Sequence, residues 1–154
     1  EFELTYDMWN AGGRKVSEIK RIAIDSGSNF SRVKSLYQSD RSGSLAVGAG
    51  IVKREGDGQF TKNASDGWMS YWEPEVPPNG HTACAVVIPG SGIDFTEADG
   101  NFLAVAKAEP GKPFVHYIGA GWSKSGDFPD ANAWEAHVKD LALRLKNPLV
   151  VKVE

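Results

Sequence analysis

The chain has 154 residues, of which 41% are hydrophobic and 24% charged, and these values are typical of one globular domain and exclude a disordered or collagen-like chain. A formal net charge of −3 gives too little positive field for nucleic acid to be the default partner. The single cysteine, Cys84, excludes an intramolecular disulfide, and no apolar run approaches the ~20 residues that a membrane-spanning helix needs.

The first third of the chain reads as strands. Residues 2–6, 15–25 and 29–37 alternate between apolar and polar side chains, with glycine- and serine-containing turns between them. A fourth apolar segment, 45–52, contains two glycines and is predicted to be a central strand with a closely packed neighbour. Because the chain opens at Glu1 inside a strand pattern, we expect it to be the C-terminal piece of a longer protein.

Further strands are predicted at 68–73, 82–88, 102–106, 114–118 and 149–153, and loops at 56–67, 89–100 and 119–127. In the first of these strands Trp68, Ser70 and Trp72 share one face, whereas Tyr71 lies on the other. About nine short strands separated by turns indicate an antiparallel β-sandwich rather than a parallel α/β sheet.

One amphipathic helix is predicted at 132–146. Asn132 and Glu135 are spaced as in a capping box, and Pro148 ends the segment. Glutamate and aspartate precede basic residues by four positions on its polar face. The helix is expected to pack an apolar stripe onto a sheet, formed by Trp134, Val138, Leu141 and Leu145.

The chain lacks the common sequence motifs for nucleotide binding and for an α/β-hydrolase nucleophile. Its three histidines, His81, His116 and His137, are too far apart in sequence to predict a metal site, so neither a metal nor a cofactor is expected. His116 is predicted to be a hydrogen-bonded core residue and His137 a solvated residue on the helix flank. Cys84 lies in an apolar run and is expected to be buried and unreactive.

Aromatic and charged residues near predicted turns are the informative feature. Sugar rings present apolar C–H faces that stack on aromatic side chains, and their hydroxyl groups bond to carboxylates and cations. A carbohydrate ligand is therefore predicted for a cluster that comprises Trp68, Tyr71, Trp72, Glu73, His81, Trp122 and Lys124.

Each member of that cluster has an expected role on a uronate-containing glycan. A base removes the proton beside the carboxylate, or an acid protonates the glycosidic oxygen. We expect His81 or Tyr71 to be this base or acid, with Glu73 as the orienting carboxylate. The remaining members would bind substrate: Lys124 the uronate carboxylate, and Trp68, Trp72 and Trp122 the sugar rings.

A structural interpretation of the same residues stays open. Tryptophans commonly fill a core, and Trp72 and Trp122 could be hydrophobic plugs that hold the loops at 74–78 and 123–127 against the sandwich. His81 would then be an ordinary loop histidine. The two interpretations differ in whether both indole rings are exposed and line one concavity.

Three segments carry a resemblance to a known family: 19–29, 68–74, and 116–128 followed by the helix and Asn147-Pro148-Leu149. Together they resemble the C-terminal part of a bacterial domain family of unknown function. That family is encoded largely in polysaccharide-utilisation loci, beside unsaturated rhamnogalacturonyl hydrolases and pectin-degrading enzymes.

The resemblance implies a fold, a location and partners. The fold would be an extended, galactose-mutarotase-like β-sandwich (a supersandwich), with residues 1–154 forming a single domain or the C-terminal half of one. The location would be the bacterial periplasm or cell surface. The partners would be an acidic oligosaccharide or polysaccharide and the N-terminal portion of the same protein. The resemblance supplies no catalytic residue.

The leading functional hypothesis is a lyase or hydrolase of uronate-containing, pectin-like oligosaccharides. The alternative is a non-catalytic glycan-binding or accessory β-sandwich module. A third hypothesis is a structural half-domain that completes the sheets of its N-terminal partner.

Overall fold

A seven-stranded antiparallel sheet forms the middle layer of the molecule. The computed structural model describes residues 1–90 and 92–150. In spatial order the sheet contains β1 (Phe2–Ala11), β2 (Arg14–Ile24), β3 (Phe30–Ser39), β10 (Pro113–Trp122), β7 (Thr82–Val87), β6 (Trp68–Trp72) and β5 (Gln59–Asn63). A three-stranded antiparallel sheet contains β4 (Leu45–Val52), β9 (Asn101–Ala108) and β8 (Asp94–Ala98).

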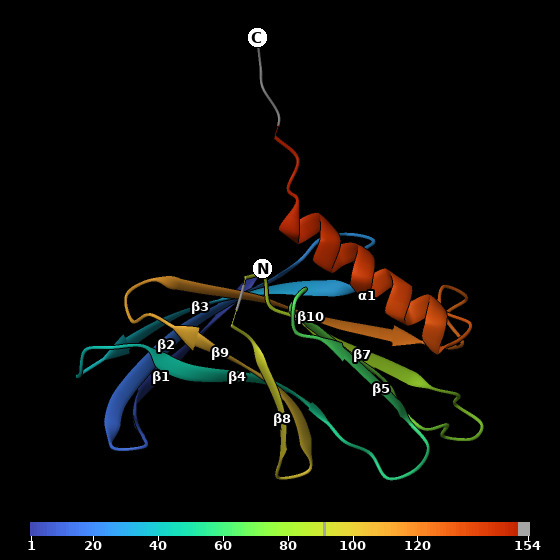
Figure 1. Ribbon diagram of the computed structural model, residues 1–154, viewed down its shortest axis with the longest axis horizontal. Helices are drawn as coiled ribbons and strands as arrows, with labels where there is room; N and C mark the ends of the chain where they lie inside the picture. Colours follow the sequence, from blue (N-terminus) through green and yellow to red (C-terminus); the bar gives the residue numbers. More distant parts are fainter. Residues whose placement is uncertain (91, 151–154) are drawn as a thin grey trace.

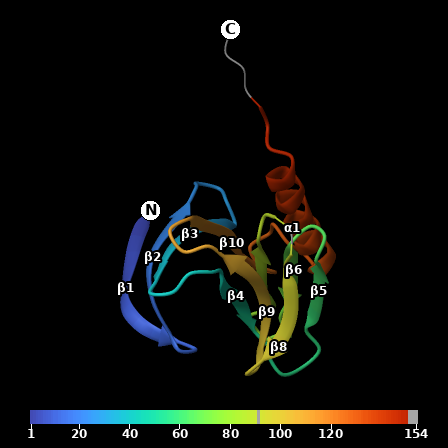
Figure 2. The ribbon, with the colours of Figure 1, turned by 60° about the vertical axis from the view of Figure 1, so that its left-hand side comes forward.

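The two sheets and the helix α1 (Ala131–Lys146) form three layers. The helix lies across one face of the seven-stranded sheet, which we call the outer face (Figure 1). The three-stranded sheet packs on the opposite, inner face, and the larger sheet curves around it (Figure 2). The predicted mainly β, sandwich-like fold with one C-terminal helix is confirmed.

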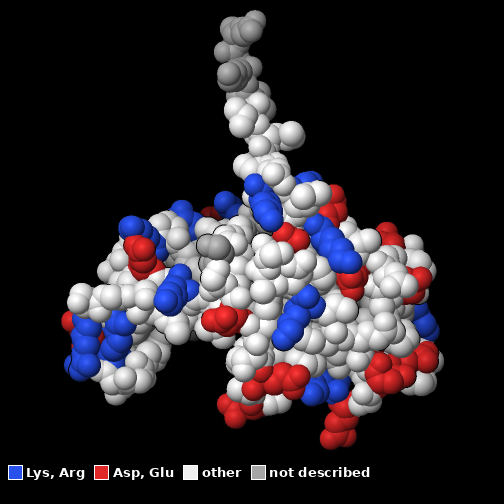
Figure 3. Space-filling view, in the orientation of Figure 1, with Lys and Arg blue, Asp and Glu red and all other residues white. Residues whose placement is uncertain are grey.

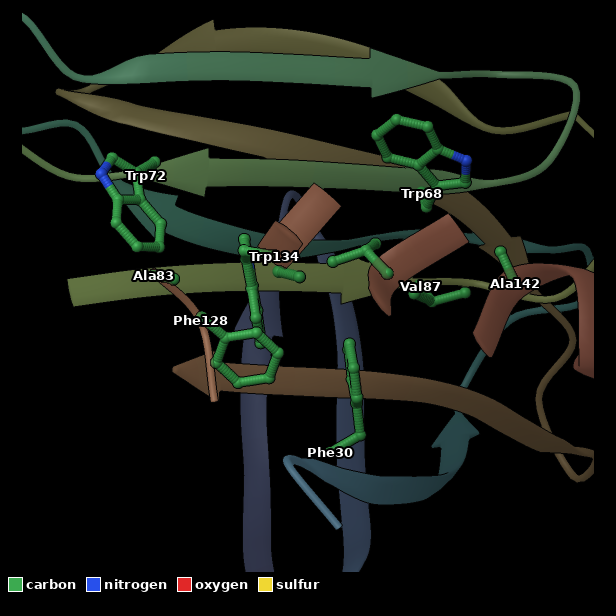
Figure 4. Close-up of a cluster of buried hydrophobic side chains, with 10 residues drawn as sticks. Phe30, Trp68, Trp72, Ala83, Val87, Phe128, Trp134 and Ala142 are labelled. Carbon is green, nitrogen blue, oxygen red and sulfur yellow. The ribbon is translucent and has the colours of Figure 1, made fainter. Parts of the chain in front are cut away.

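Strand β6 shows why both faces of the large sheet are buried here. Trp68 and Trp72 point to the outer face and join the core beneath the helix, together with Phe128 and Trp134 (Figure 4). Tyr71 points to the opposite face of the strand and joins the core between the two sheets. All five residues of β6 are buried because apolar layers cover the strand on both sides.

The helix begins one residue earlier than the sequence predicts. Asp130 is the N-cap, and its carboxylate accepts a hydrogen bond from the Ala133 N–H at 2.9 Å, so the proposed capping box at Asn132 is wrong. Trp134 and Val138 are fully buried, which confirms that the apolar stripe faces the sheet. The two expected ion pairs along the polar face, Glu135 with Lys139 and Asp140 with Arg144, are present.

Two glycines of β10 make room for aromatic rings of the core beneath the helix. A Cβ atom at Gly119 would lie 2.4 Å from the Phe30 ring, and one at Gly121 would lie 2.9 Å from Phe128. The segment predicted to be a glycine-rich loop therefore begins as strand, through Trp122, and its glycines make room for the core beneath α1.

Several other predicted boundaries are corrected. Segments 59–63 and 94–98 were predicted to be loops but form β5 and β8. β4 is an edge strand of the smaller sheet rather than a central strand, although Gly50 does allow close packing against Leu103. Residues 149–150 are not in a strand, and the rest of the predicted final strand lies outside the described residues. In the described part of the chain, no helix is long and apolar enough to span a membrane.

Candidate functional site

The structure divides the predicted carbohydrate cluster between the two faces of the sheet. Trp68 and Trp72 are 3% and 5% exposed, so neither ring can stack on a sugar, and the predicted exposure of Trp72 is wrong. Trp72 instead stacks on the His81 imidazole, with ring centroids 5.3 Å apart. Tyr71 is also buried, on the inner face, with its hydroxyl 3.3 Å from the main-chain N and O of Arg54.

The predicted acid/base groups are not assembled into one constellation. Nδ1 of His81 lies 2.9 Å from the main-chain carbonyl oxygen of Glu73, not from its carboxylate. That carboxylate pairs with Nε of Arg54 at 3.5 Å. Tyr71 lies on the other face of β6. The side chains of His81, Glu73 and Tyr71 therefore do not meet at one point where they could act on the same substrate.

Trp122 and Lys124 hold a loop. Trp122 is 48% exposed, as predicted, and its indole N–H donates a hydrogen bond to the Asn79 carbonyl oxygen at 2.7 Å. The ammonium of Lys124 donates to the Pro78 carbonyl oxygen, and the Ser123 hydroxyl accepts from the His81 N–H at 2.9 Å. These contacts favour the structural interpretation, in which this segment fastens the proline-containing loop after β6.

A polar groove of about 590 Å³ opens on the outer face, between α1 and the turn that joins β2 to β3. The turn 25–29 forms one wall, the helix forms the other, and the sheet forms the floor. The side chains that give the groove its chemical character are Asp25, Arg32, Tyr117, His137, Leu141 and Arg144.

Strand register and helix periodicity bring these residues together. Arg32 lies opposite Tyr117 in the pairing of β3 with β10, and alternation directs both side chains to the outer face. His137, Leu141 and Arg144 follow one another at helical spacing on α1. No local motif marks this groove, because its residues come from three separate segments of the sequence.

His137 is partly buried rather than solvated. Its imidazole lies beside Phe30 and Phe128, with ring centroids 5.6 and 5.2 Å away. The prediction of a solvated helix flank failed because the adjacent aromatic residues come from β3 and from the segment before α1. The imidazole of His137 therefore packs against the two phenylalanine rings and also lines the groove.

The groove and the sheet beside it carry both acidic and basic side chains, and two of the three arginines there are paired with carboxylates. Arg144 pairs with Asp140 at 3.0 Å, and Arg21 pairs with Glu3 at 2.6 Å, a contact that raises the pKa of Arg21. Among the described residues, no ion pair involves Arg32. Elsewhere on the molecule, acidic side chains gather along the edge away from the helix, at the bottom of Figure 3. Arg32 is therefore the cation best placed to bind an anionic ligand.

A second polar cluster lies on the inner face. Burial and then the nearby Glu18 raise the pKa of Tyr37 to about 12. Burial and then Lys20 lower the pKa of His116 from 6.5 to about 4. Glu18 Oε1 lies 3.5 Å from Lys20 Nζ but accepts no hydrogen bond in the described structure, and Nδ1 of His116 also lacks a partner there. His116 is thus partly buried, and its Nδ1 lacks the hydrogen bond expected of a hydrogen-bonded core histidine.

The inner cluster is less suited to a sugar than the groove. Glu18 is 7% exposed and Ser35 is fully buried, so a pyranose has no access to either polar group. Cys84 is half-buried, and burial raises the pKa of its thiol to about 11, as expected for an unreactive cysteine. Among the described residues, no three His, Cys, Asp or Glu side chains are grouped to hold a metal ion.

Comparisons with known proteins agree with this architecture. Residues 1–151 match the family described as "Domain of unknown function (DUF4861)". The chain is 28% identical over 160 residues to "Uncharacterized protein P7" of Formosa agariphila, an alignment that covers 99% of the chain but 39% of that protein. The chain thus spans well under half the length of this curated relative.

A solved structure shares the fold at 11% sequence identity. It is titled "Putative kojibiose phosphorylase from human microbiome", and the superposition has a TM-score of 0.58. The match covers 90% of this chain and 19% of the other one. The described fold is therefore similar to one part of a much larger protein.

Proposed function

The chain belongs to the DUF4861 family, and we propose that it is the glycan-binding β-sandwich part of a carbohydrate-active protein, with uronate-containing glycans as ligands. The observation that carries the proposal is the outer groove, which is lined by a tyrosine, a histidine and an arginine that forms no ion pair with the described residues. The fold shared with a chain whose title names a kojibiose phosphorylase is compatible with a carbohydrate role.

The chemistry of a uronate matches the groove group by group. The guanidinium of Arg32 offers paired N–H donors that fit a carboxylate. The ring of Tyr117, partly buried in the floor, offers an apolar face for sugar C–H groups. Asp25 and the polar turn next to it supply acceptors and donors for hydroxyl groups.

Binding is better supported than catalysis by the described residues. The predicted catalytic groups His81, Glu73 and Tyr71 have no common reaction centre, and Trp68 and Trp72 are buried. We propose that lyase or hydrolase activity, if the whole protein has it, uses groups from the longer chain as well. His137 and Asp25 are the titratable groups that this chain would contribute.

The proposal extends to the biological setting. Pectin-like polymers are too large to enter a bacterial cytoplasm intact, so a protein that binds them is expected in the periplasm or on the cell surface. Genes for pectin degradation are expected beside its own. Cell fractionation of the native organism would test the location.

Charge removal in the groove tests the binding site. Arg32→Gln should weaken the binding of tri-galacturonate by about tenfold, since a charge-assisted hydrogen bond contributes about 1.5 kcal/mol. Lys15→Gln is the matched control, because Lys15 is exposed on β2 but does not line the groove. Calorimetric titration of both variants and the wild type would measure the effect. Equal affinities for all three proteins would contradict the proposal.

A further inference from the structure

The two sheets differ in size, and the excess of the larger one is not covered. The seven-stranded sheet faces a sheet of three strands. The core between the sheets contains residues of β6, β7, β9 and β10 but none of β1 or β2. The inner face of β1, and of β2 after Glu18, therefore lies beyond the edge of the smaller sheet (Figure 2), whereas Val16 and Glu18 at the start of β2 are buried.

That uncovered face is apolar. Register places four side chains of β1 on the inner face, opposite even-numbered residues of β2. Their exposed fractions are 56% for Phe2, 38% for Leu4, 42% for Tyr6 and 40% for Trp9. Four large apolar side chains in one row on one strand are more than the scattered exposure of a typical monomer surface.

Unpartnered polar atoms lie on the same face. Glu18 and Ser35 are more than nine-tenths buried, yet Glu18 Oε1 and Ser35 Oγ have no hydrogen-bond partner among the described residues. Nδ1 of His116 is in the same position. The described residues already bury these atoms, so the uncovered area of the inner face is marked by the apolar row of β1 and not by these polar groups.

The smaller sheet offers a place for such a segment to attach. β4 is an edge strand, so one side of its backbone is not paired within the described sheet. Its start is held near β2, because the Arg14 guanidinium donates to the Ser44 carbonyl oxygen at 2.9 Å. Strands added beside β4 would extend the smaller sheet over β1 and β2.

We propose that strands from the rest of a longer protein add to the free edge of β4 and cover the inner face of β1 and β2. The chain covers 39% of the curated relative, so that relative contains additional chain. The apolar row would pack into a continuation of the existing core between the sheets.

Hydrogen exchange tests this proposal on unmodified protein. The 154-residue chain would be compared with the full-length gene product that contains it. Amides of β1 and β4 should exchange at least about tenfold more slowly in the full-length product. Equal exchange rates in the two forms would overturn the proposal. Protection that depends on the concentration of the 154-residue chain would overturn it too, because a second copy would then be the occupant.

A pair of substitutions adds a second readout. Leu4 on the inner face and Ile19 on the outer face are each 38% exposed. Leu4→Gln should lower the melting temperature of the full-length product, whereas Ile19→Gln should leave it nearly unchanged. Equal shifts would contradict a covered inner face. If Leu4→Gln does not fold, the exchange comparison on wild-type protein still decides.

Discussion

A single carboxylate sets the start of α1. Asp130 accepts from the Ala133 N–H, whereas Asn132 already lies within the helix. Asp130→Ala should lower the free energy of unfolding by about 1 kcal/mol, the usual contribution of an N-cap side chain. Asn132→Ala, the matched control, should change it by less than about 0.5 kcal/mol. Urea denaturation would measure both, and an equal loss in the two variants would contradict the assignment.

His116 should make stability depend on pH. The unfolded chain protonates this residue near pH 6.5, but the folded chain does so only near pH 4. The unfolded state therefore binds more protons between these values, and the free energy of unfolding should fall as the pH is lowered from 6.5 to 4. The expected loss is about 3 kcal/mol, fully reached below pH 4.

The variant His116→Gln isolates this contribution. It should show a smaller fall in the free energy of unfolding between pH 7 and pH 4 than the wild type. An NMR titration of the imidazole would give the pKa directly. A midpoint near 6.5 in the folded protein would mean that the ring is solvated rather than buried.

At the candidate site, the sequence shows which residues could bind a sugar, but it does not show whether their side chains are exposed or buried. Proximity to a turn suggested exposure for both Trp72 and Trp122, and only Trp122 is exposed. The difference arises from α1, which comes more than fifty residues after Trp72 in the chain and covers it. Burial imposed by such a distant element has no local signal.

Packing of the outer aromatic core against β10 depends on the absence of side chains at Gly119 and Gly121. Gly119→Ala would place a Cβ atom 2.4 Å from the Phe30 ring, so it should lower the free energy of unfolding by about 1–3 kcal/mol. Gly48 is the matched control in β4, where the closest atom to an added Cβ is 4.0 Å away. Gly48→Ala should leave stability unchanged or raise it by up to about 1 kcal/mol.

Thermal or urea unfolding of the two glycine variants would decide the point. Equal stabilities would show that the Phe30 ring can shift away from β10 without a cost in free energy.

The strands that the sequence missed have weak patterns for a physical reason. β5 and β8 each contain one phenylalanine among mostly polar residues, since both are edge strands with one side open to solvent. The helix and the strands with strong alternation were predicted correctly because their periodicity reflects a buried face. The edge position of β4 could not be predicted, because glycine-containing apolar strands occur in both central and edge places.

At the scale of the whole molecule, the two faces of the seven-stranded sheet carry different structural features. The outer face carries the helix and the polar groove, and the inner face carries the smaller sheet and an uncovered apolar row. Neither feature is visible in the sequence, because Arg32, Tyr117 and His137 meet only through strand register and helix docking. The sandwich architecture could be predicted from the alternation of apolar and polar residues along the strands. The residues that come together on each face could not.

Recognition of a carboxylate by the outer groove is the central claim, and a matched pair of ligands tests it most directly. Calorimetric titration would compare tri-galacturonate with the same trisaccharide after reduction of its carboxyl groups to neutral alcohols. Both retain the ring faces and hydroxyl groups, so they differ chiefly in the charge that Arg32 would bind. We expect the acidic trisaccharide to bind at least about tenfold more tightly at low salt. Equal affinities, or no binding of either ligand, would contradict the account.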